Sequence, residues 1–548
     1  MKIGIYLGYR PNTQFNNQGL GRFLANLTRG MEQQQVEQIT ILCPSWLRSD
    51  IEKHLRGNGS TAIRVLAPKS VPPIVLVYER LSKGKNEQQP SRRAFLMLGL
   101  RRLWLRASDT VLASISYALS TRWWPIFPIV AILLAAIVVV LSPLLILMAL
   151  LVLLAALPSA VRSRIRVPGL IRKPLGKLKR LLPDALARFE GRRRPPLRWA
   201  IYDYIQKSEI RAMLSLARRD NGVDIWYVPT VFWPEASSLK PVVVQCFPDM
   251  LLSEFPTKFT LDVGNPLPVY RRAKEAIEGG EYFVTYSRAT AEKSLVRRFN
   301  IDPSKVFAVP HAAMDLSRHL AIQGTLDDVY ARQRLATTIL EEHRNAKWNN
   351  DRYLSNFSFE DTTYIFFASQ FRPNKNLMNL AFAYEAVLRK KHRYAKMILT
   401  GSPKDAPEFE NYVTKNRLQY DILFAHDVSD RVLAALYHKA TLVVNPTYFE
   451  GGFPFTFSEG MSVGTPSVMS RIPQTEEIIT GELAKTMLFD PLSADDMANR
   501  IAFGLDNRSL LLQLQSPLFE TLKQRTWQHV ARDHINVFEK VLEKNRTN

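Results

Sequence analysis

Short apolar runs recur along the 548 residues and alternate with segments long enough to form helices. In the first half of the chain, this pattern predicts strands at residues 2–8, 38–42, 224–228, 241–245 and 282–285. In the second half, it predicts strands at residues 364–368, 395–400, 422–424 and 442–446. Strands that alternate with helices form parallel sheets, so we expect an α/β protein with two Rossmann-like parallel-sheet domains.

The chain is too long for one hydrophobic core, and changes in composition divide it. Two separate stretches, residues 1–82 and 200–325, form the first predicted domain, and residues 358–520 form the second. We interpret the polar residues 326–357 as a connector and residues 83–199 as an insertion in the first domain. The last segment, residues 521–548, contains a predicted helix at 527–544 that we expect to pack back onto the first domain.

The insertion holds an uncharged run at residues 123–161, whose apolar centre, residues 127–157, is 31 residues long. As one helix it would be roughly 46 Å long, against roughly 30 Å for the hydrocarbon core of a bilayer. Pro143 lies near its middle and predicts a break. We therefore expect a helical hairpin that dips into the cytoplasmic leaflet, with Trp123 and Trp124 at headgroup level. Two short tilted spans are the alternative.

Basic residues gather around this hairpin. Residues 83–125 and 161–199 carry +17 of the formal net charge of +23. An apolar hairpin with basic flanks favours an anionic membrane surface over a nucleic acid as the partner. Cys43 and Cys246 lie far apart and lack metal-ligand spacing. This cysteine usage suits a reduced compartment, so we expect the protein at the cytoplasmic face of the inner membrane.

A glycine-rich stretch at residues 445–472 has the pattern of strand, loop, helix and strand. Gly451 and Gly452 would let backbone N–H groups at a helix start approach an anion. Nearby, Glu450 and Glu459 could accept hydrogen bonds from sugar hydroxyls. The pattern therefore suggests a phosphorylated sugar as the ligand, whereas the plainer interpretation is an ordinary turn with solvated carboxylates.

A second pattern follows the predicted strand 364–368, where Arg372 and Lys375 lie three residues apart before a helix. A diphosphate that leaves as an anion needs such fixed positive charge in the transition state. Two solvated cations at a helix start are the alternative. The pair Asp495-Asp496 is read as a charge effect at another helix start rather than as a metal site.

Together, the Glu-containing loop, the following Gly-x-Pro and the Arg-x-x-Lys turn resemble the signature of the family 4 (group 1) glycosyltransferases. The resemblance implies a GT-B fold and a retaining transferase that needs no cofactor or metal. It assigns the donor's ribose to Glu459 and its diphosphate to Arg372 and Lys375. The resemblance also assigns the transferred sugar to Glu450 or to the backbone of residues 451–453, which include Phe453. Gly401, after another predicted strand, joins the expected donor-binding residues.

This sequence departs from the family in the spacing of its acidic residues. Glu450 and Glu459 are nine positions apart, whereas the family has eight. With Glu459 as the anchor of the alignment, Gly451 takes the place of the first acidic residue.

The first half resembles the same family more loosely. Gly19 and Gly21 open a predicted helix, and Ser287 matches the family's serine after a strand. Asp249 stands where many members carry His-Asp, without the histidine. These four residues are expected to line the acceptor side of the cleft. After Pro310 the family usually has Asn-Gly, but this chain has His311-Ala312.

The resemblance and the hairpin imply a hexosyltransferase that acts on a lipid-linked or membrane-surface saccharide in bacterial polysaccharide or lipopolysaccharide synthesis. GDP-mannose is the donor suggested by analogy, which would make the protein a mannosyltransferase. Two alternatives stay open: a nucleotide-sugar epimerase or phosphorylase of the same fold, and a non-catalytic membrane scaffold that binds nucleotide sugars.

Overall fold

The computed structural model describes residues 1–11, 13, 19–55, 62–73, 75, 132, 197–220, 222–250, 267–322, 324, 328–347 and 357–547. Apart from residue 132, the predicted hairpin lies outside these residues, and so do Trp123, Trp124 and Pro143. One compact unit comprises Met1–Tyr6, Gly19–Ile39 and Val223–Asn548, and a second comprises Leu7–Gln18 and Thr40–Gly222.

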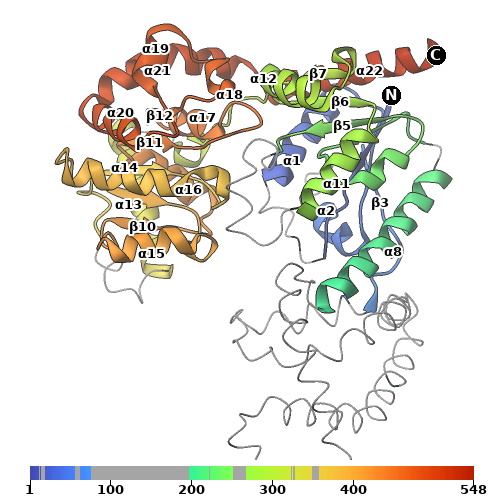
Figure 1. Cartoon of the computed structure of the whole chain (residues 1–548), viewed down its shortest axis with the longest axis horizontal. Helices are drawn as coiled ribbons and strands as arrows, with labels where there is room; N and C mark the ends of the chain where they lie inside the picture. The colour runs from blue at the N-terminus through green and yellow to red at the C-terminus, as the bar shows by residue number, and fades with distance from the viewer. Residues whose placement is uncertain are drawn as a thin grey trace, which may run out of the picture. The chain divides into compact units, whose positions relative to one another are not determined.

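Within the described residues, the first sheet has seven strands in the order β3-β2-β1-β4-β5-β6-β7. Figure 1 labels β3, β5, β6 and β7 of this sheet. Their bounds are β1 Lys2–Tyr6, β2 Gln38–Leu42, β3 Ile63–Leu66, β4 Ile225–Val228, β5 Val243–Phe247, β6 Tyr282–Thr285 and β7 Val306–Ala308. The ladders from β1 through β4, β5 and β6 to β7 are parallel. Strand β5 begins two residues later than predicted, and Pro241 in the predicted start has no N–H to give to a ladder.

The helices that accompany this sheet are α1 Gly19–Gln33, α2 Arg48–Leu55, α8 Leu197–Arg219, α11 Leu267–Glu278, α12 Arg288–Thr290 with a π-helical continuation Ala291–Arg298, and α22 Trp527–Thr547. Helix α22 packs along α1, as predicted for the C-terminal helix. At the contact, a Cβ on Gly30 would lie 2.5 Å from the carbonyl oxygen of Trp527. The absence of a side chain at Gly30 lets the two helices approach this closely.

The second sheet has six parallel strands in the order β10-β9-β8-β11-β12-β13. Their bounds are β8 Tyr364–Phe367, β9 Lys396–Leu399, β10 Ile422–Phe424, β11 Leu442–Asn445, β12 Ser467–Ser470 and β13 Leu488–Phe489. Its helices are α13 Asp328–Lys347, α14 Leu377–Arg389, α15 Pro407–Lys415, α16 Asp430–Lys439, α17 Phe455–Ser462, α18 Pro473–Glu476, α19 Gly481–Met487, α20 Ala494–Asp506 and α21 Arg508–Gln524. Short 3-10 turns occur at Ser45–Leu47, Pro234–Ser238, Pro303–Lys305, Ser317–Leu320, Pro373–Lys375 and Pro403–Asp405.

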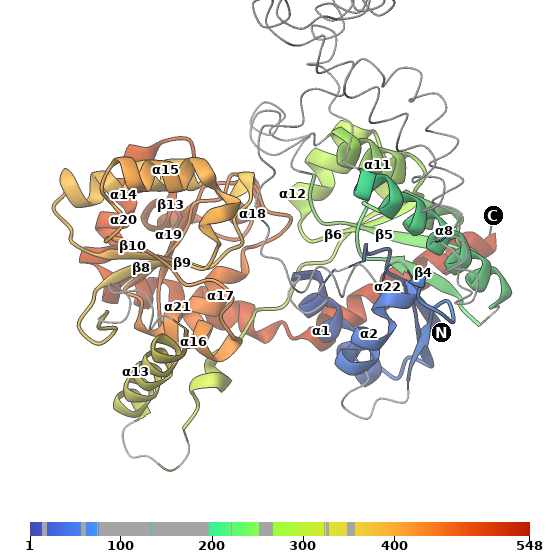
Figure 2. The same ribbon diagram turned by 90° about the horizontal axis from the view of Figure 1, so that it is seen from below.

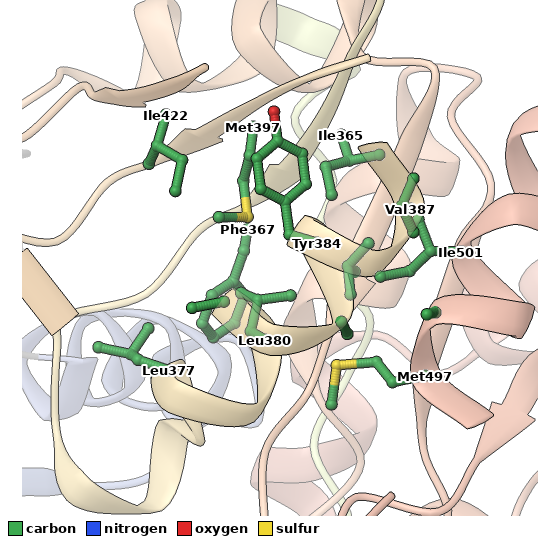
Figure 3. Packing of buried hydrophobic residues seen from close by; sticks show 14 of the residues in the cluster. Ile365, Phe367, Leu377, Leu380, Tyr384, Val387, Met397, Ile422, Met497 and Ile501 are labelled. Atoms are coloured by element: carbon green, nitrogen blue, oxygen red, sulfur yellow. The ribbon is translucent and has the colours of Figure 1, made fainter. Parts of the chain in front are cut away.

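Both faces of the second sheet are covered, and this explains why its strands are apolar without alternation. Ile365 and Phe367 of β8 pack with α14, α15 and α20 on one face (Figure 3). Tyr364 and Phe366 of the same strand pack with α13 and α16 on the other face. Figure 2 shows helices on both sides of this sheet. The two parallel sheets confirm the predicted pair of Rossmann-like parallel-sheet domains.

The segment interpreted as a connector contains a long helix. Helix α13 buries Ala336, Ile339 and Leu340 against α16, in the same cluster as one face of the second sheet. These positions follow the spacing of one helical face, although charged residues surround them in the sequence. Most of residues 326–357 is therefore part of the second domain's packing rather than a polar linker.

In the part of the chain that the structure describes, no helix combines the length and the apolar character that crossing a membrane requires.

Candidate functional site

Two loops that are far apart in the sequence meet at the carboxyl edge of the second sheet. Strands β8 and β11 are neighbours, with Val443 opposite Phe366. The loop after β8 carries Lys375, and the loop after β11 carries Glu450. Lys375 Nζ lies 2.7 Å from Glu450 Oε1, and the two side chains are 16% and 20% exposed. The structure thus brings together two residues that sequence analysis placed on the donor.

The loop after β8 closes in a 3-10 turn, Pro373–Lys375, with Arg372 as its N-cap. The Arg372 side chain is exposed, and its guanidinium donates a hydrogen bond to Gln370 Oε1 at 3.2 Å. Asn376 then takes a left-handed conformation with φ of 56°, and α14 begins at the next residue. The predicted order of strand, Arg-x-x-Lys turn and helix is correct.

The two loop glycines are fixed by close backbone approaches. A Cβ on Gly451 would lie 1.8 Å from the carbonyl oxygen of Pro248, and one on Gly452 would lie 2.8 Å from Cβ of Tyr286. Neither position has room for a side chain as the loop stands. Ser287, predicted at the acceptor side, lies here too, with its Oγ 3.1 Å from the carbonyl oxygen of Gly451.

Asp249 is electrostatically coupled to the Lys375–Glu450 pair. Its carboxyl is half-buried, one residue beyond the Pro248 carbonyl that faces Gly451. Burial raises the pKa of Asp249, and the charge of Glu450 raises it further, whereas Lys375 and Arg372 lower it. The charges of Glu450, Lys375 and Arg372 therefore lie close enough to Asp249 to change the pKa of its carboxyl.

Glu459 lies on α17, the helix that follows the loop carrying Glu450, and the residue is 8% exposed. Tyr437 donates a hydrogen bond to Glu459 Oε2 at 2.7 Å. Burial raises the pKa of the Glu459 carboxyl, while the bond from Tyr437 and the charge of Arg22 lower it. The Tyr437 hydroxyl and the charge of Arg22 thus favour the ionised form of Glu459.

Gly401 and Phe453 have packing roles in this structure. A Cβ on Gly401 would lie 2.1 Å from the ring of Phe371, so this ring occupies the space that a side chain would need. The ring of Phe453 meets that of Phe457 edge to face at 5.4 Å.

Gly19 is the first residue of α1, and Gly21 lies in its first turn. Arg22 follows them and forms an ion pair with Asp430 of α16 at 2.9 Å. Sequence analysis missed Arg22. A cation in the first turn of a helix opposes the helix dipole, and this oddity was a signal that could have identified it.

His311, which replaces the family's usual asparagine, stacks between aromatic rings. Its ring centroid lies 3.9 Å from that of Tyr286 and 4.8 Å from that of Phe455. Burial lowers the pKa of His311 to about 3, and the nearby charges of His534 and Arg525 lower it as well. The histidine is therefore neutral at physiological pH.

Asp495 and Asp496 lie in the first turn of α20, where Ser493 caps the helix. The Asp496 carboxylate accepts a hydrogen bond from the backbone N–H of Asp490 at 2.7 Å. These contacts match the predicted helix-start role. Among the described residues, no group of three or more His, Cys, Asp and Glu side chains is arranged to hold a metal ion.

Residues 362–507 match the family model described as "Glycosyl transferases group 1". A curated relative, lipopolysaccharide 1,2-N-acetylglucosaminetransferase of Salmonella typhimurium, is 24% identical over 184 residues. That match covers 31% of this chain and 47% of the relative, so the chain spans about half the relative's length.

Solved structures share the fold at low sequence identity. The N-terminal domain of trehalose-6-phosphate phosphatase from Candida albicans matches with a TM-score of 0.54 and 12% identity, over 98% of this chain and 96% of that chain. Anabaena HepE in complex with UDP-glucose matches with a TM-score of 0.52 and 11% identity, over 99% of each chain. The chain has the GT-B fold, and its residues 362–507 match the group 1 glycosyltransferase model, in line with the resemblance seen in the sequence.

Proposed function

We propose that this protein transfers a sugar from a nucleotide-sugar donor to an acceptor hydroxyl. The observation that carries the proposal is the pairing of Lys375 with Glu450 within the group 1 segment, at the carboxyl edge of a parallel sheet. In open parallel sheets, ligands bind at this edge where the strand order reverses. The order reverses between β8 and β11, the two strands that carry these residues.

In the proposed reaction, the acceptor oxygen replaces the diphosphate oxygen at the anomeric carbon of the donor sugar, with retention of configuration. Arg372 and Lys375 bind the diphosphate and stabilise the negative charge that it gains as the bond breaks. Glu459 accepts hydrogen bonds from the ribose. Glu450, or the backbone of Gly451 to Phe453, holds the transferred sugar. Asp249 and Ser287 belong to the acceptor side.

The identity of the donor has two parts, the nucleotide base and the sugar. A screen of donors should begin with UDP-sugars, because HepE was solved with UDP-glucose and the Salmonella relative is named for N-acetylglucosamine transfer. GDP-mannose, suggested by analogy, should be tested next in this screen.

The acceptor that we propose is a lipid-linked or membrane-surface saccharide of bacterial polysaccharide or lipopolysaccharide synthesis. The named substrate of the Salmonella relative supports this choice, as do the apolar run 127–157 and its basic flanks. In this proposal the hairpin keeps the protein at the cytoplasmic face of the membrane. Cysteines engineered at residues 142 and 143 would test the dipping hairpin in intact cells. The native Cys43 and Cys246 are buried, so they provide a low background, and ready labelling from outside would contradict the dipping form.

The central experiment measures binding and transfer with the purified full-length chain. We expect UDP, GDP or ADP to raise the melting temperature, and the matching nucleotide sugar to be consumed only with an acceptor. Sugar conversion without an acceptor would favour the epimerase alternative. Nucleotide binding with no turnover on any acceptor would favour the scaffold, and no binding at all would refute the proposal.

A further inference from the structure

Two buried asparagines fasten the Lys375 turn to the loop that carries Glu450. On one side of Lys375, the Asn374 backbone carbonyl accepts a hydrogen bond from the N–H of Tyr448 at 2.8 Å. The Asn374 side-chain Nδ2 donates to the carbonyl of Phe449, the residue before Glu450, at 3.2 Å. Asn374 is 3% exposed.

On the other side of Lys375, Asn376 makes a matching attachment. Its Nδ2 donates to the carbonyl of Pro446 at 2.9 Å and to the carbonyl of Pro491 at 2.7 Å. Asn376 is also 3% exposed. Lys375 is thus bracketed by two amides, each hydrogen-bonded to the segment that leads to Glu450. A shift of either loop would have to break these bonds.

The two amides use only part of their hydrogen-bonding capacity in these attachments. Among the described residues, neither Asn374 Oδ1 nor Asn376 Oδ1 has a hydrogen-bond partner, although both atoms are buried. The bonds that the two amides donate, one on each side of Lys375, indicate a role toward the residue that they enclose.

We propose that Asn374 and Asn376 are positioning residues that set the place of Lys375 relative to Glu450 and to the donor diphosphate. This inference rests on the proposed function. The physical reason is that a displacement of about 1 Å in a positioned group can cost about a hundredfold in rate. The two asparagines act through Lys375 and need not touch the ligand themselves.

Substitution by glycine at position 376 gives a clean test. Asn376 has φ of 56°, in the left-handed region that glycine adopts without strain. Asn376→Gly therefore removes the two side-chain hydrogen bonds while the backbone conformation is kept. Asn374→Ala is the second variant. Asn507→Ala is the matched control, because it also removes a side-chain hydrogen bond, from Nδ2 to the carbonyl of Phe503, elsewhere in the same domain.

The experiment measures UDP and GDP binding by calorimetry for the full-length chain, in the wild type and in a Lys375→Ala background. We expect Asn376→Gly and Asn374→Ala to weaken binding by at least about tenfold, and Asn507→Ala by less than about twofold. In the Lys375→Ala background, each asparagine substitution should change binding by less than about twofold, because its effect passes through Lys375. Melting temperatures establish that each variant is folded. If Asn374→Ala unfolds the protein, Asn376→Gly carries the test.

Two results would overturn the inference while the proposed function stands: nucleotide binding unchanged in the asparagine variants, or weakened equally with and without Lys375. If the wild type binds no nucleotide, the proposed function fails, and the positioning role fails with it.

Discussion

Replacement of Lys375 by alanine tests the proposed diphosphate clamp most directly. The substitution removes the ammonium group that lies 2.7 Å from Glu450 and leaves that carboxylate without its partner. It shortens one side chain in a loop and changes no strand or helix. We therefore expect catalysis to fall while the protein stays folded.

The expected sizes follow from the exposure of the pair. At 16% and 20% exposed, Lys375 and Glu450 lie between a surface pair, worth about 0–1 kcal/mol, and a buried pair, whose disruption costs about 3–5 kcal/mol. Lys375→Ala should therefore cost about 1–3 kcal/mol of stability. One preorganised group on developing negative charge contributes about 2.7–4 kcal/mol to the transition state, so kcat should fall by about 10²–10³.

The assay measures initial rates of sugar transfer, with thermal unfolding of the same preparations. Lys396→Ala is the matched control, because Lys396 also forms a 2.7 Å ion pair, with Asp421, but at the opposite end of β9 from Gly401. The control should keep wild-type kcat within about twofold. Transfer by Lys375→Ala within about threefold of wild type would refute the clamp, and an equal loss in both variants would mean that the effect is one of stability.

Three further predictions concern individual side chains. Gly401→Ala should destabilise the protein by about 1–3 kcal/mol in thermal or denaturant unfolding, because its Cβ would lie 2.1 Å from the ring of Phe371; wild-type stability would contradict this. Tyr437→Phe removes a hydrogen bond that lowers the pKa of Glu459, so the acidic limb of the kcat/KM profile should move to higher pH, and an unmoved limb would separate Glu459 from donor binding. Burial lowers the pKa of His534 from 6.5 to about 4. As the pH falls, this histidine is therefore protonated in the unfolded chain before it is protonated in the folded protein. Stability should drop by about 2 kcal/mol from this group between pH 8 and pH 5, and His534→Phe should lack that part of the loss in urea unfolding.

Most strands could be predicted because a parallel strand is buried on both faces and reads as a short apolar run. Residues 38–42 and 282–285 are predicted with the bounds that β2 and β6 have in the structure. Helix α13 differs from the predicted polar connector because charged residues surround Ala336, Ile339 and Leu340 in the sequence. The spacing of these three residues marks one helical face and is the signal that predicts this helix.

The contact between Lys375 and Glu450 could not be predicted from local sequence patterns. Lys375 and Glu450 are 75 residues apart, and no local pattern says that their loops touch. The same holds for Asn374, whose side chain bonds to a carbonyl 75 residues away. Local propensity fixes a strand and a turn, but strand order is a property of the whole sheet. The chemical types of the site residues could therefore be predicted from the sequence, but which of these residues lie close together could not.

Strand order also explains why the candidate site lies where it does. After β8 the chain adds β9 and β10 on one side of it, and β11, β12 and β13 then follow on its other side. Loops that leave β8 and β11 must diverge toward opposite halves of the sheet, and a crevice opens between strands whose connections part in this way. The hydrogen bonds from Asn374 and Asn376 span this point and hold the two diverging loops together. Lys375 and Glu450 meet at this point, 2.7 Å apart, so the strand order of the sheet determines where the two residues of the proposed donor site lie.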